Sequence, residues 1–348
     1  MKNRFFKNLM NFQKKVICEN KSIKPENLDL EIIRLFISIQ NQNIHMISII
    51  GAGNVGSTAA LQILSHNLDD VTLIDIAEGK GEGEAMDFSQ MVCEMGIDRK
   101  IIGTNDFSKL EGSDIIVVPA GMGRKPGETR MDLFHKNMNI IKSVGENIKK
   151  YSPESIVLMV TNPLDAMTYV MYKILGVNRE RVFGMSGALD NLRFKNVLSS
   201  KLNVSRKSVT TLVIGEHGEG MLPLIRYSTI NGVSLNEFAS EEVLNECYAD
   251  TIGAAAKIIG LKGATFYAPS MAIYSMVEAI KLDKRILMPA STFLKGEYGQ
   301  EGICIGVPVI LGSNGIEKIV ELDLNQKESE QFNKGVQNLK NAVKETNL

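Results

Sequence analysis

The sequence predicts an α/β protein, with a doubly wound parallel sheet in its first half followed by a second, α+β domain. Three observations predict this. Short apolar runs alternate with segments of helical pattern, the first of these runs ends in a glycine-rich turn, and the alternation is lost after about residue 165. Such runs are typical of strands buried on both faces, and strands that alternate with helices form βαβ units.

Four apolar runs define the strands of the first half. They are MISIIG, VTLIDI, DIIVVPA and SIVLMV, at 46–51, 71–76, 114–120 and 155–160. Helical segments connect them, from the first glycine turn to about His66, over 78–95 and over 130–150. Parallel strands need a crossover connection, which is usually a helix. This order therefore predicts a first domain with a parallel sheet over residues 46–165.

Residues 166–348 mix helices and strands without a regular order. We expect helices over 163–175 and 187–202, a long helical region over 235–282 and a polar, Lys- and Glu-rich amphipathic helix at the end of the chain. Strands are expected near 181–185, 209–215, 285–292 and 302–311. This mixture is typical of an α+β domain.

Composition argues against several classes of partner. The formal net charge of −1 provides no global basic field for nucleic acid. No apolar run reaches the roughly 18–20 residues that span a membrane. The cysteines are far apart and lack metal-ligand spacing, which indicates buried or free thiols in a reducing compartment; they are Cys18, Cys93, Cys247 and Cys304. We therefore expect a cytoplasmic protein without nucleic-acid, membrane or metal partners.

Residues 1–45 form an N-terminal extension with two interpretations. Five basic residues precede the first acid, Glu19, as in a transit peptide for organellar import. The segment is rich in Lys rather than in Arg and Ser, however, and Met46 directly precedes the first strand. We favour a non-essential extension, or a start codon assigned too early, and leave import open.

The glycine turn after the first strand has the G-x-G-x-x-G pattern of a dinucleotide-binding (Rossmann) fold. GAGNVG follows a buried strand and precedes a helix, and an acidic residue, Asp75, closes the second strand. The glycines let a pyrophosphate approach the backbone, and the helix N-terminus offers unsatisfied N–H groups. We predict that a dinucleotide binds at Gly51, Gly53, Asn54, Val55 and Gly56.

Asp75 indicates which dinucleotide binds. Its carboxylate would accept hydrogen bonds from both adenosine ribose hydroxyls and would repel a 2′-phosphate. The next residues, Ile76, Ala77 and Glu78, provide no cation to offset that repulsion. The prediction is NAD rather than NADP.

Three residues of the second half have the chemistry of an acid–base site. Asp190 and Arg193 stand three apart in LDNLRF, and His217 follows a strand in GEHGEG. Hydride transfer at an alcohol carbon requires proton transfer at its oxygen, which histidine can perform near neutral pH. A carboxylate can orient the imidazole, and an arginine can bind a substrate carboxylate. Each residue alone has a plainer interpretation, a surface ion pair or an exposed histidine, and spacing does not prove proximity.

The stretch GMGRKPGETR, residues 121–130, gathers Arg124, Lys125 and Arg130 with three glycines and a proline. Such a segment can be neither a regular helix nor a strand. It is either a solvated surface turn or a loop that receives an anion and closes over a site.

Together these motifs resemble the lactate/malate dehydrogenase superfamily. GAGNVG, IDI, RKPGETR followed by MDLF, VTNPLDAMTY, LDNLRF and GEHG occur in the order and spacing of that family, from Met46 to the C-terminal helix. The sequence is most similar to the lactate-dehydrogenase-like branch of its malate-specific members. The resemblance implies a homodimer or homotetramer, and the 235–282 region has residues of the kind used for assembly.

The resemblance also implies a role for each matching position. His217 would be the catalytic acid/base and Asp190 the residue that orients it. Arg193 would bind the substrate carboxylate next to the reacting carbon, and Arg130 would polarise the carbonyl. Asn162 would bond to the substrate oxygen near the nicotinamide.

Further positions match the cofactor contacts of the family; they are Asn137, Val160, Thr161 and Asn162. The sequence departs from the family at positions without an implied catalytic role, which are Glu216, Glu219 and Asn191. The role of Thr265 stays open.

The arginine at position 124 indicates which substrate the resemblance implies. In the family, a neutral amide at this position accompanies pyruvate and lactate, and an arginine accompanies oxaloacetate and malate. A buried Arg124 that faces the methyl group of pyruvate would lose its partner, which costs roughly 3–5 kcal/mol. We therefore predict NAD-dependent, reversible oxidation of (S)-malate to oxaloacetate, a reaction of the tricarboxylic acid cycle, with lactate or another 2-hydroxyacid as the alternative substrate.

Two other classes stay open. An NAD-dependent glycosidase would share the fold but would need Cys and His metal ligands near the nicotinamide, and the cysteines fall outside the candidate motifs. A non-catalytic NAD-sensing module would not need the His217, Asp190 and three-arginine set.

Overall fold

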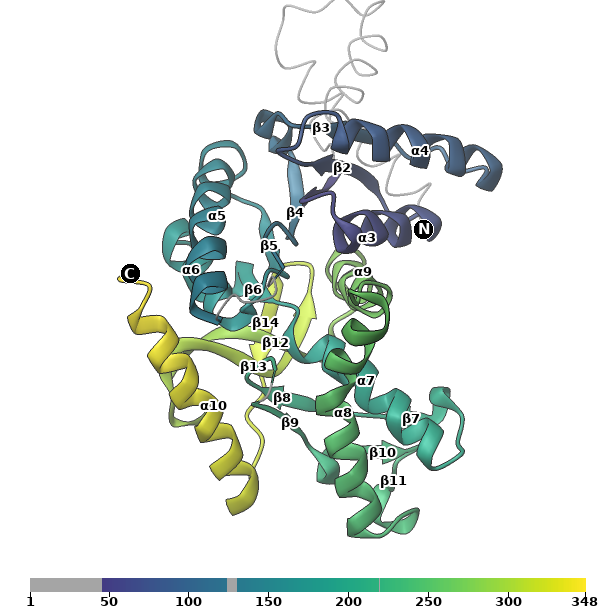
Figure 1. Ribbon diagram of the computed structural model, residues 1–348, viewed down its shortest axis with the longest axis vertical. Helices are drawn as coiled ribbons and strands as arrows, with labels where there is room; N and C mark the ends of the chain where they lie inside the picture. Colours follow the sequence, from purple (N-terminus) through teal and green to yellow (C-terminus); the bar gives the residue numbers. More distant parts are fainter. Residues whose placement is uncertain (1–45, 124–129, 219) are drawn as a thin grey trace, which may run out of the picture. The chain divides into compact units, whose positions relative to one another are not determined.

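The computed structural model describes residues 46–123, 130–218 and 220–348. Its first half alternates strands and helices as predicted (Figure 1). The strands are β1 (Met46–Ile50), β2 (Asp70–Ile74), β3 (Ile101–Thr104), β4 (Ser113–Val118), β5 (Ile156–Met159) and β6 (Val182–Gly184). The helices between them are α3 (Asn54–Ser65), α4 (Lys80–Met95), α5 (Arg130–Tyr151) and α6 (Leu164–Leu175).

These six strands form a parallel sheet in the order β3-β2-β1-β4-β5-β6. The order reverses direction between β1 and β4, which is the arrangement of a doubly wound sheet. The predicted fold class is confirmed. The predicted division of the chain at residue 165 stays a prediction.

Both faces of the parallel sheet are covered by apolar side chains, because successive residues of a strand point to opposite faces. In β4, Ile115 and Val117 belong to the core on the side of α3 and α9. Ile116 and Val118 belong to the core on the side of α5 and α6. Figure 1 shows the two helix pairs on opposite sides of the sheet. The burial explains why these strands are continuous apolar runs.

The second half continues the sheet with antiparallel strands. The order after β6 is β12 (Ile286–Lys295), β13 (Glu301–Gly312), β8 (Val213–Gly215) and β9 (Met221–Pro223), and β14 (Gly315–Ile319) pairs with β13. A separate small sheet contains β7 (Val209–Thr210), β10 (Thr229–Ile230) and β11 (Val233–Ser234). The helices are α7 (Ser186–Lys201), α8 (Glu241–Lys262), α9 (Tyr267–Lys281) and α10 (Gln326–Lys344).

Two predicted elements are divided in the structure. The strand expected over 209–215 is interrupted at Thr211 and Leu212, where the chain passes from the small sheet to the large one. The helical region expected over 235–282 is divided at Gly263, whose φ of 82° ends α8 in the left-handed conformation that glycine favours. The short strands β3, β9, β10, β11 and β14 were not predicted, because most of them are too short for a periodic pattern.

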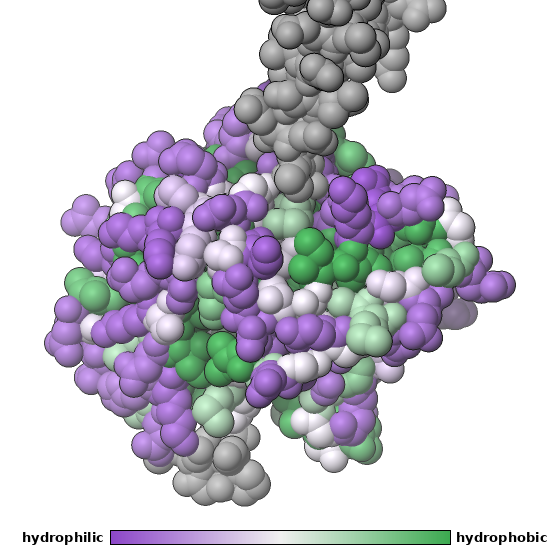
Figure 2. Space-filling model, turned by 90° about the horizontal axis from the view of Figure 1, so that it is seen from above, coloured by the Kyte–Doolittle hydropathy of each residue, from purple (hydrophilic) through white to green (hydrophobic). Residues whose placement is uncertain are grey.

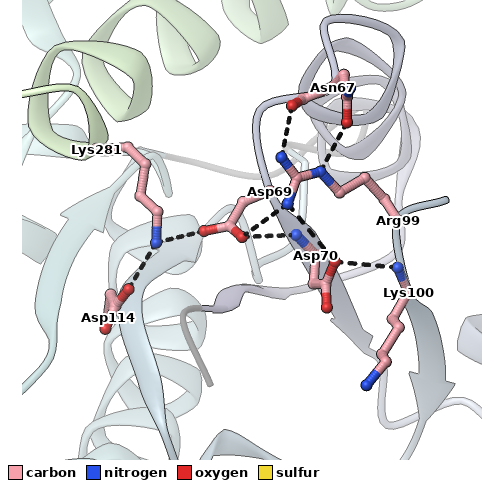
Figure 3. Close-up of polar contacts among 7 residues, drawn as sticks. All are labelled: Asn67, Asp69, Asp70, Arg99, Lys100, Asp114 and Lys281. Carbon is pink, nitrogen blue, oxygen red and sulfur yellow. Dashed lines mark hydrogen bonds and ion pairs between the residues drawn. The ribbon is translucent and has the colours of Figure 1, made fainter. Parts of the chain in front are cut away.

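A polar cluster lies at the amino ends of the parallel strands (Figure 3). Lys281, the last residue of α9, pairs with the buried Asp69 before β2 and with Asp114 of β4, the latter at 2.7 Å. Arg99 Nη1 lies 3.7 Å from Asp69 Oδ1 and its Nε donates to Asn67 Oδ1 at 2.8 Å. These contacts tie α9 and the loop before β3 to the sheet, at the edge opposite the glycine turn.

The surface is mostly hydrophilic on the face that Figure 2 shows, where apolar side chains gather in separate patches. Within the described ranges, the most exposed large apolar residues are Ile76 and Leu261, at 82% and 81%. Among the described residues, no helix has the length and apolar character that a membrane crossing requires.

Candidate active site

The residues predicted to bind a dinucleotide lie at the carboxyl ends of parallel strands. Gly51 directly follows β1, Asp75 follows β2, and Val160 follows β5. The strand order reverses beside β1, and in open α/β sheets ligands bind outside the strand ends at such a point. The fold therefore places these residues where a dinucleotide would bind.

The GAGNVG turn combines close packing with open space. A Cβ on Gly56 would lie 1.8 Å from the Gly51 carbonyl oxygen, so only glycine lets α3 begin this close to β1. A Cβ on Gly53 would meet no described atom within 4 Å. Gly53 is also the N-cap of α3 and provides no side-chain cap for the first-turn N–H groups. Open N–H groups at a helix N-terminus suit the pyrophosphate of NAD.

Asp75 fixes the glycine turn and has a cationic neighbour. Its Oδ2 accepts the Ala52 N–H at 2.8 Å, and its Oδ1 accepts the Ala77 N–H at 2.9 Å. The Nζ of Lys80 lies 3.8 Å from Asp75 Oδ2. The three residues after Asp75 provide no cation, but the left-handed turn at Gly79, with φ of 74°, begins α4 so that its first residue returns to Asp75. Lys80 therefore supplies a cation near Asp75, although the sequence directly after Asp75 predicted none.

Asn137 connects the chain before residue 124 to the turn after β5. Its Oδ1 accepts the Met122 N–H at 2.8 Å, and its Nδ2 donates to the carbonyl oxygens of Met122 and Asn162 at 3.1 and 2.6 Å. Thr161 Oγ1 donates to the Ala120 carbonyl oxygen at 2.6 Å. These bonds fix the strand ends that face the cofactor site, and the Asn162 side chain is exposed.

Asp190 brings His217 and Arg193 together. Its Oδ1 accepts a hydrogen bond from Arg193 Nη1 at 2.7 Å, and its Oδ2 lies 2.8 Å from His217 Nδ1. The side chains of Asp190, Arg193 and His217 are 1%, 9% and 10% exposed. Sequence spacing alone left their proximity open, and the fold supplies it by packing α7 against β8.

The environment of His217 favours its protonated form. Burial is the largest single influence and lowers the pKa, but the charge and the hydrogen bond of Asp190 outweigh it, with a further contribution from Asp165. Arg193 acts in the opposite direction. The net result is a pKa above the usual value for histidine, which suits a group that exchanges a proton near neutral pH.

Asp165 is a further residue of this site that the sequence did not reveal. It lies in the first turn of α6, is buried, and accepts the backbone N–H of His217 at its Oδ2, 2.8 Å away. The motif VTNPLDAMTY contains it, but 52 positions separate the two residues. The available signal was a carboxylate among apolar residues that are buried throughout the start of a helix.

Part of the predicted site lies outside the described residues. This holds for Arg124 and Lys125, for Glu219, and for the side chain of Arg130, whose backbone begins α5. Over the described ranges, no group of three or more His, Cys, Asp or Glu side chains could hold a metal ion. Cys93, Cys247 and Cys304 are free thiols.

The chain matches two descriptions of one protein family. Residues 45–184 match "lactate/malate dehydrogenase, NAD binding domain", and residues 187–347 match "lactate/malate dehydrogenase, alpha/beta C-terminal domain". Among its relatives, the malate dehydrogenase of Methanosarcina barkeri is 43% identical over 304 residues, which cover 87% of this chain and 99% of the relative. The malate dehydrogenase of Bacteroides thetaiotaomicron is 47% identical over 291 residues, 82% of this chain and 93% of the relative.

Solved structures agree with these relatives. The malate dehydrogenase of Cryptosporidium parvum has a TM-score of 0.85 at 38% identity, and the match covers 87% of this chain and 99% of that one. A lactate dehydrogenase of the same organism, in complex with lactic acid and nicotinamide adenine dinucleotide, has a TM-score of 0.84 at 35% identity and covers 87% and 98%. Fold similarity alone thus does not separate the two activities. With both halves matched and the relatives covered almost end to end, the chain belongs to the lactate/malate dehydrogenase family.

Proposed function

We propose that this protein is an NAD-dependent malate dehydrogenase that interconverts (S)-malate and oxaloacetate. The observation that carries the proposal is the buried His217–Asp190–Arg193 arrangement, in which one carboxylate orients both the acid/base and the substrate-binding arginine. The family and the named relatives support it, and so does Arg124.

The chain's own residues would perform binding and proton transfer. Asp190 holds Nδ1 of His217, which leaves Nε2 to take the proton from the malate hydroxyl or to return it to oxaloacetate. Arg193 uses Nη1 for Asp190 and has further N–H groups to bind the carboxylate beside the reacting carbon. Bound NAD would supply the hydride acceptor for that carbon. Gly51, Gly53, Gly56 and Asp75 would hold its pyrophosphate and adenosine ribose, with Asn54, Val55, Asn137, Val160, Thr161 and Asn162 as further contacts.

Two arginines of the segment 121–130 would complete the site. Arg130 would polarise the carbonyl oxygen in the transition state, where preorganised positive charge acts most strongly. Arg124 would pair with the second carboxylate of the substrate.

The direct test is a comparison of kcat/KM for oxaloacetate and pyruvate with NADH. We expect oxaloacetate to be preferred by about a hundredfold to a few thousandfold, which corresponds to the roughly 3–5 kcal/mol cost of an unpaired buried arginine. A kcat/KM for pyruvate that equals or exceeds that for oxaloacetate would refute malate specificity. Unchanged turnover after incubation with EDTA is expected as well and would argue against a glycosidase.

Lys80 provides a second prediction, on cofactor choice. Its ammonium beside Asp75 would offset part of the repulsion between that carboxylate and a 2′-phosphate. Lys80→Ala is expected to weaken NADPH binding several-fold, because an exposed ion pair contributes only ~0.2–1 kcal/mol, and to leave NADH binding almost unchanged. Fluorescence titration of both cofactors measures this without turnover. Equal losses for NADH and NADPH would show that Lys80 does not discriminate between them.

We further propose that the protein assembles as a homodimer or homotetramer in the cytoplasm. The division of 235–282 into α8 and α9 leaves large apolar side chains exposed near the junction, at Ile259, Leu261 and Tyr267. The free state of Cys93, Cys247 and Cys304 is consistent with a reducing compartment.

A further inference from the structure

A second buried carboxylate contacts His217, in addition to that of Asp190. Asp165, at the start of α6, is 3% exposed, and its Oδ2 accepts the backbone N–H of His217 at 2.8 Å. Asp190 binds the ring of the same histidine from α7. His217 is therefore held at its backbone by one carboxylate and at its ring by another, from two different helices.

The surroundings of Asp165 contain few charges. Cys304 of β13 is near the carboxyl group, and burial raises the pKa of its thiol well above the usual value, so that it is neutral. Ser291 of β12 lies beside the carboxyl group but forms no hydrogen bond of standard geometry with it. The charged groups that act on Asp165 are His217 and Glu216, and Glu216 accepts a hydrogen bond from Asn338 of α10.

The proton affinity of this carboxyl group is unusual. Burial raises the pKa of Asp165 to about 6, although the neighbouring Ser291 hydroxyl, the backbone N–H of His217 and the His217 ring charge all act to lower it. The charge of Asp165 favours protonated His217, and the charge of His217 favours ionised Asp165, so the two groups influence each other's protonation. Interacting groups of this kind titrate as a coupled pair.

We propose that Asp165 is a positioning residue for His217. Asp165 holds the backbone of His217 after β8, and its carboxylate supplies a second negative charge near the imidazole. Asp165 does not touch the substrate; it acts through His217. The loop needs such support because Gly215 and Gly218, with φ of 91° and 138°, flank the histidine and give its backbone little rigidity of its own. The inference rests on the function proposed for His217.

The proton affinity of His217 therefore depends on whether Asp165 is ionised. While Asp165 is ionised, its charge favours the imidazolium form of His217. When Asp165 takes up a proton, that stabilisation is lost, and His217 releases its own proton more readily. Oxidation of malate needs neutral His217 and reduction of oxaloacetate needs the imidazolium, so Asp165 shifts the pH at which the profile of each direction rises or falls.

Asp165→Asn tests the proposal, because the amide oxygen can still accept the His217 N–H while the charge is removed. We expect the pKa of His217 to fall. In the free protein, ¹⁵N-histidine labelling gives few signals, since the chain has four histidines, and the His217 signals are assigned by their absence from His217→Asn. The midpoint of the ring titration should move to lower pH, and the half-points of both pH profiles of kcat/KM should move with it. Unmoved midpoints would overturn the proposal.

Asp69→Asn is the matched control. It also neutralises a buried aspartate, but one at the opposite edge of the sheet, paired with Lys281 (Figure 3). It is expected to lower stability and to leave the titration of His217 unchanged. A purely structural role of Asp165 would give the same result as this control.

If Asp165→Asn does not fold, an NMR titration of the wild-type protein tests the proposal instead. The backbone ¹⁵N signal of His217 should then follow two protonation steps, one of them near pH 6 from Asp165, whereas a single step would overturn the proposal. The titration needs no turnover. Failure of this inference would therefore appear as an unmoved titration in a protein that still oxidises malate. Failure of the proposed malate dehydrogenase function would appear as absent activity, whatever the titration shows.

Discussion

Replacement of His217 by Asn is expected to lower kcat by about 10²- to 10⁴-fold in both directions of the reaction, the range typical of a lost general acid/base. Asparagine is similar in size and can still contact Asp190, so the packing of the loop is retained. It cannot take up a proton near neutral pH. The loss therefore falls on the proton transfer that must accompany hydride transfer.

Steady-state kinetics of both directions, together with NADH binding, measure this effect. NADH affinity should change little, because the cofactor residues lie at the ends of β1, β2 and β5 and on α3 and α5, elements that do not carry His217. His66→Asn is the control, since His66 follows α3 and stacks on Tyr274 with ring centroids 4.3 Å apart. A variant of His217 that retained more than a tenth of the wild-type kcat would remove this residue from the acid/base role.

The parallel half of the fold could be predicted from sequence because a strand that is buried on both faces has a continuous run of apolar residues. Each strand of that half that was predicted is a continuous apolar run, and β4 divides its residues between two cores. In the small sheet, β10 and β11 could not be predicted in this way. Each of these two strands has two residues, too few to show a period.

Only those parts of the candidate site that lie within one local motif could be predicted from the residues alone. The glycine turn and Asp75 act within one βαβ unit, so their spacing carries the information. The contact between His217 and Asp190 joins residues 27 positions apart, and the contact between His217 and Asp165 joins residues 52 apart. The first was inferred from family motifs. The second required the packed structure, because a buried aspartate in α6 has no sequence pattern that points to a loop after β8.

Conversion of Arg124 to Gln is the second change with a large expected effect, on the choice of substrate. Arg124 would pair with the distal carboxylate of oxaloacetate, and in Arg124→Gln that carboxylate would lose its charged partner. Pyruvate, in contrast, would no longer face an unpaired buried cation. Since removal of one partner from a buried ion pair costs roughly 3–5 kcal/mol, the ratio of kcat/KM for oxaloacetate to that for pyruvate should fall by about a hundredfold to a few thousandfold.

The shift in this ratio distinguishes electrostatic selection from selection by shape. A pocket that differs by one methylene-sized group discriminates by only about 1–3 kcal/mol, so a large shift requires the charge. Lys125→Gln removes a positive charge from the adjacent position of the same segment and should leave the ratio unchanged. If both variants lowered it equally, the net charge of the segment 121–130, rather than a specific pair with Arg124, would attract the dicarboxylate. If neither did, selection would reside in other pocket residues, and the physical case for malate over lactate would have to rest on them.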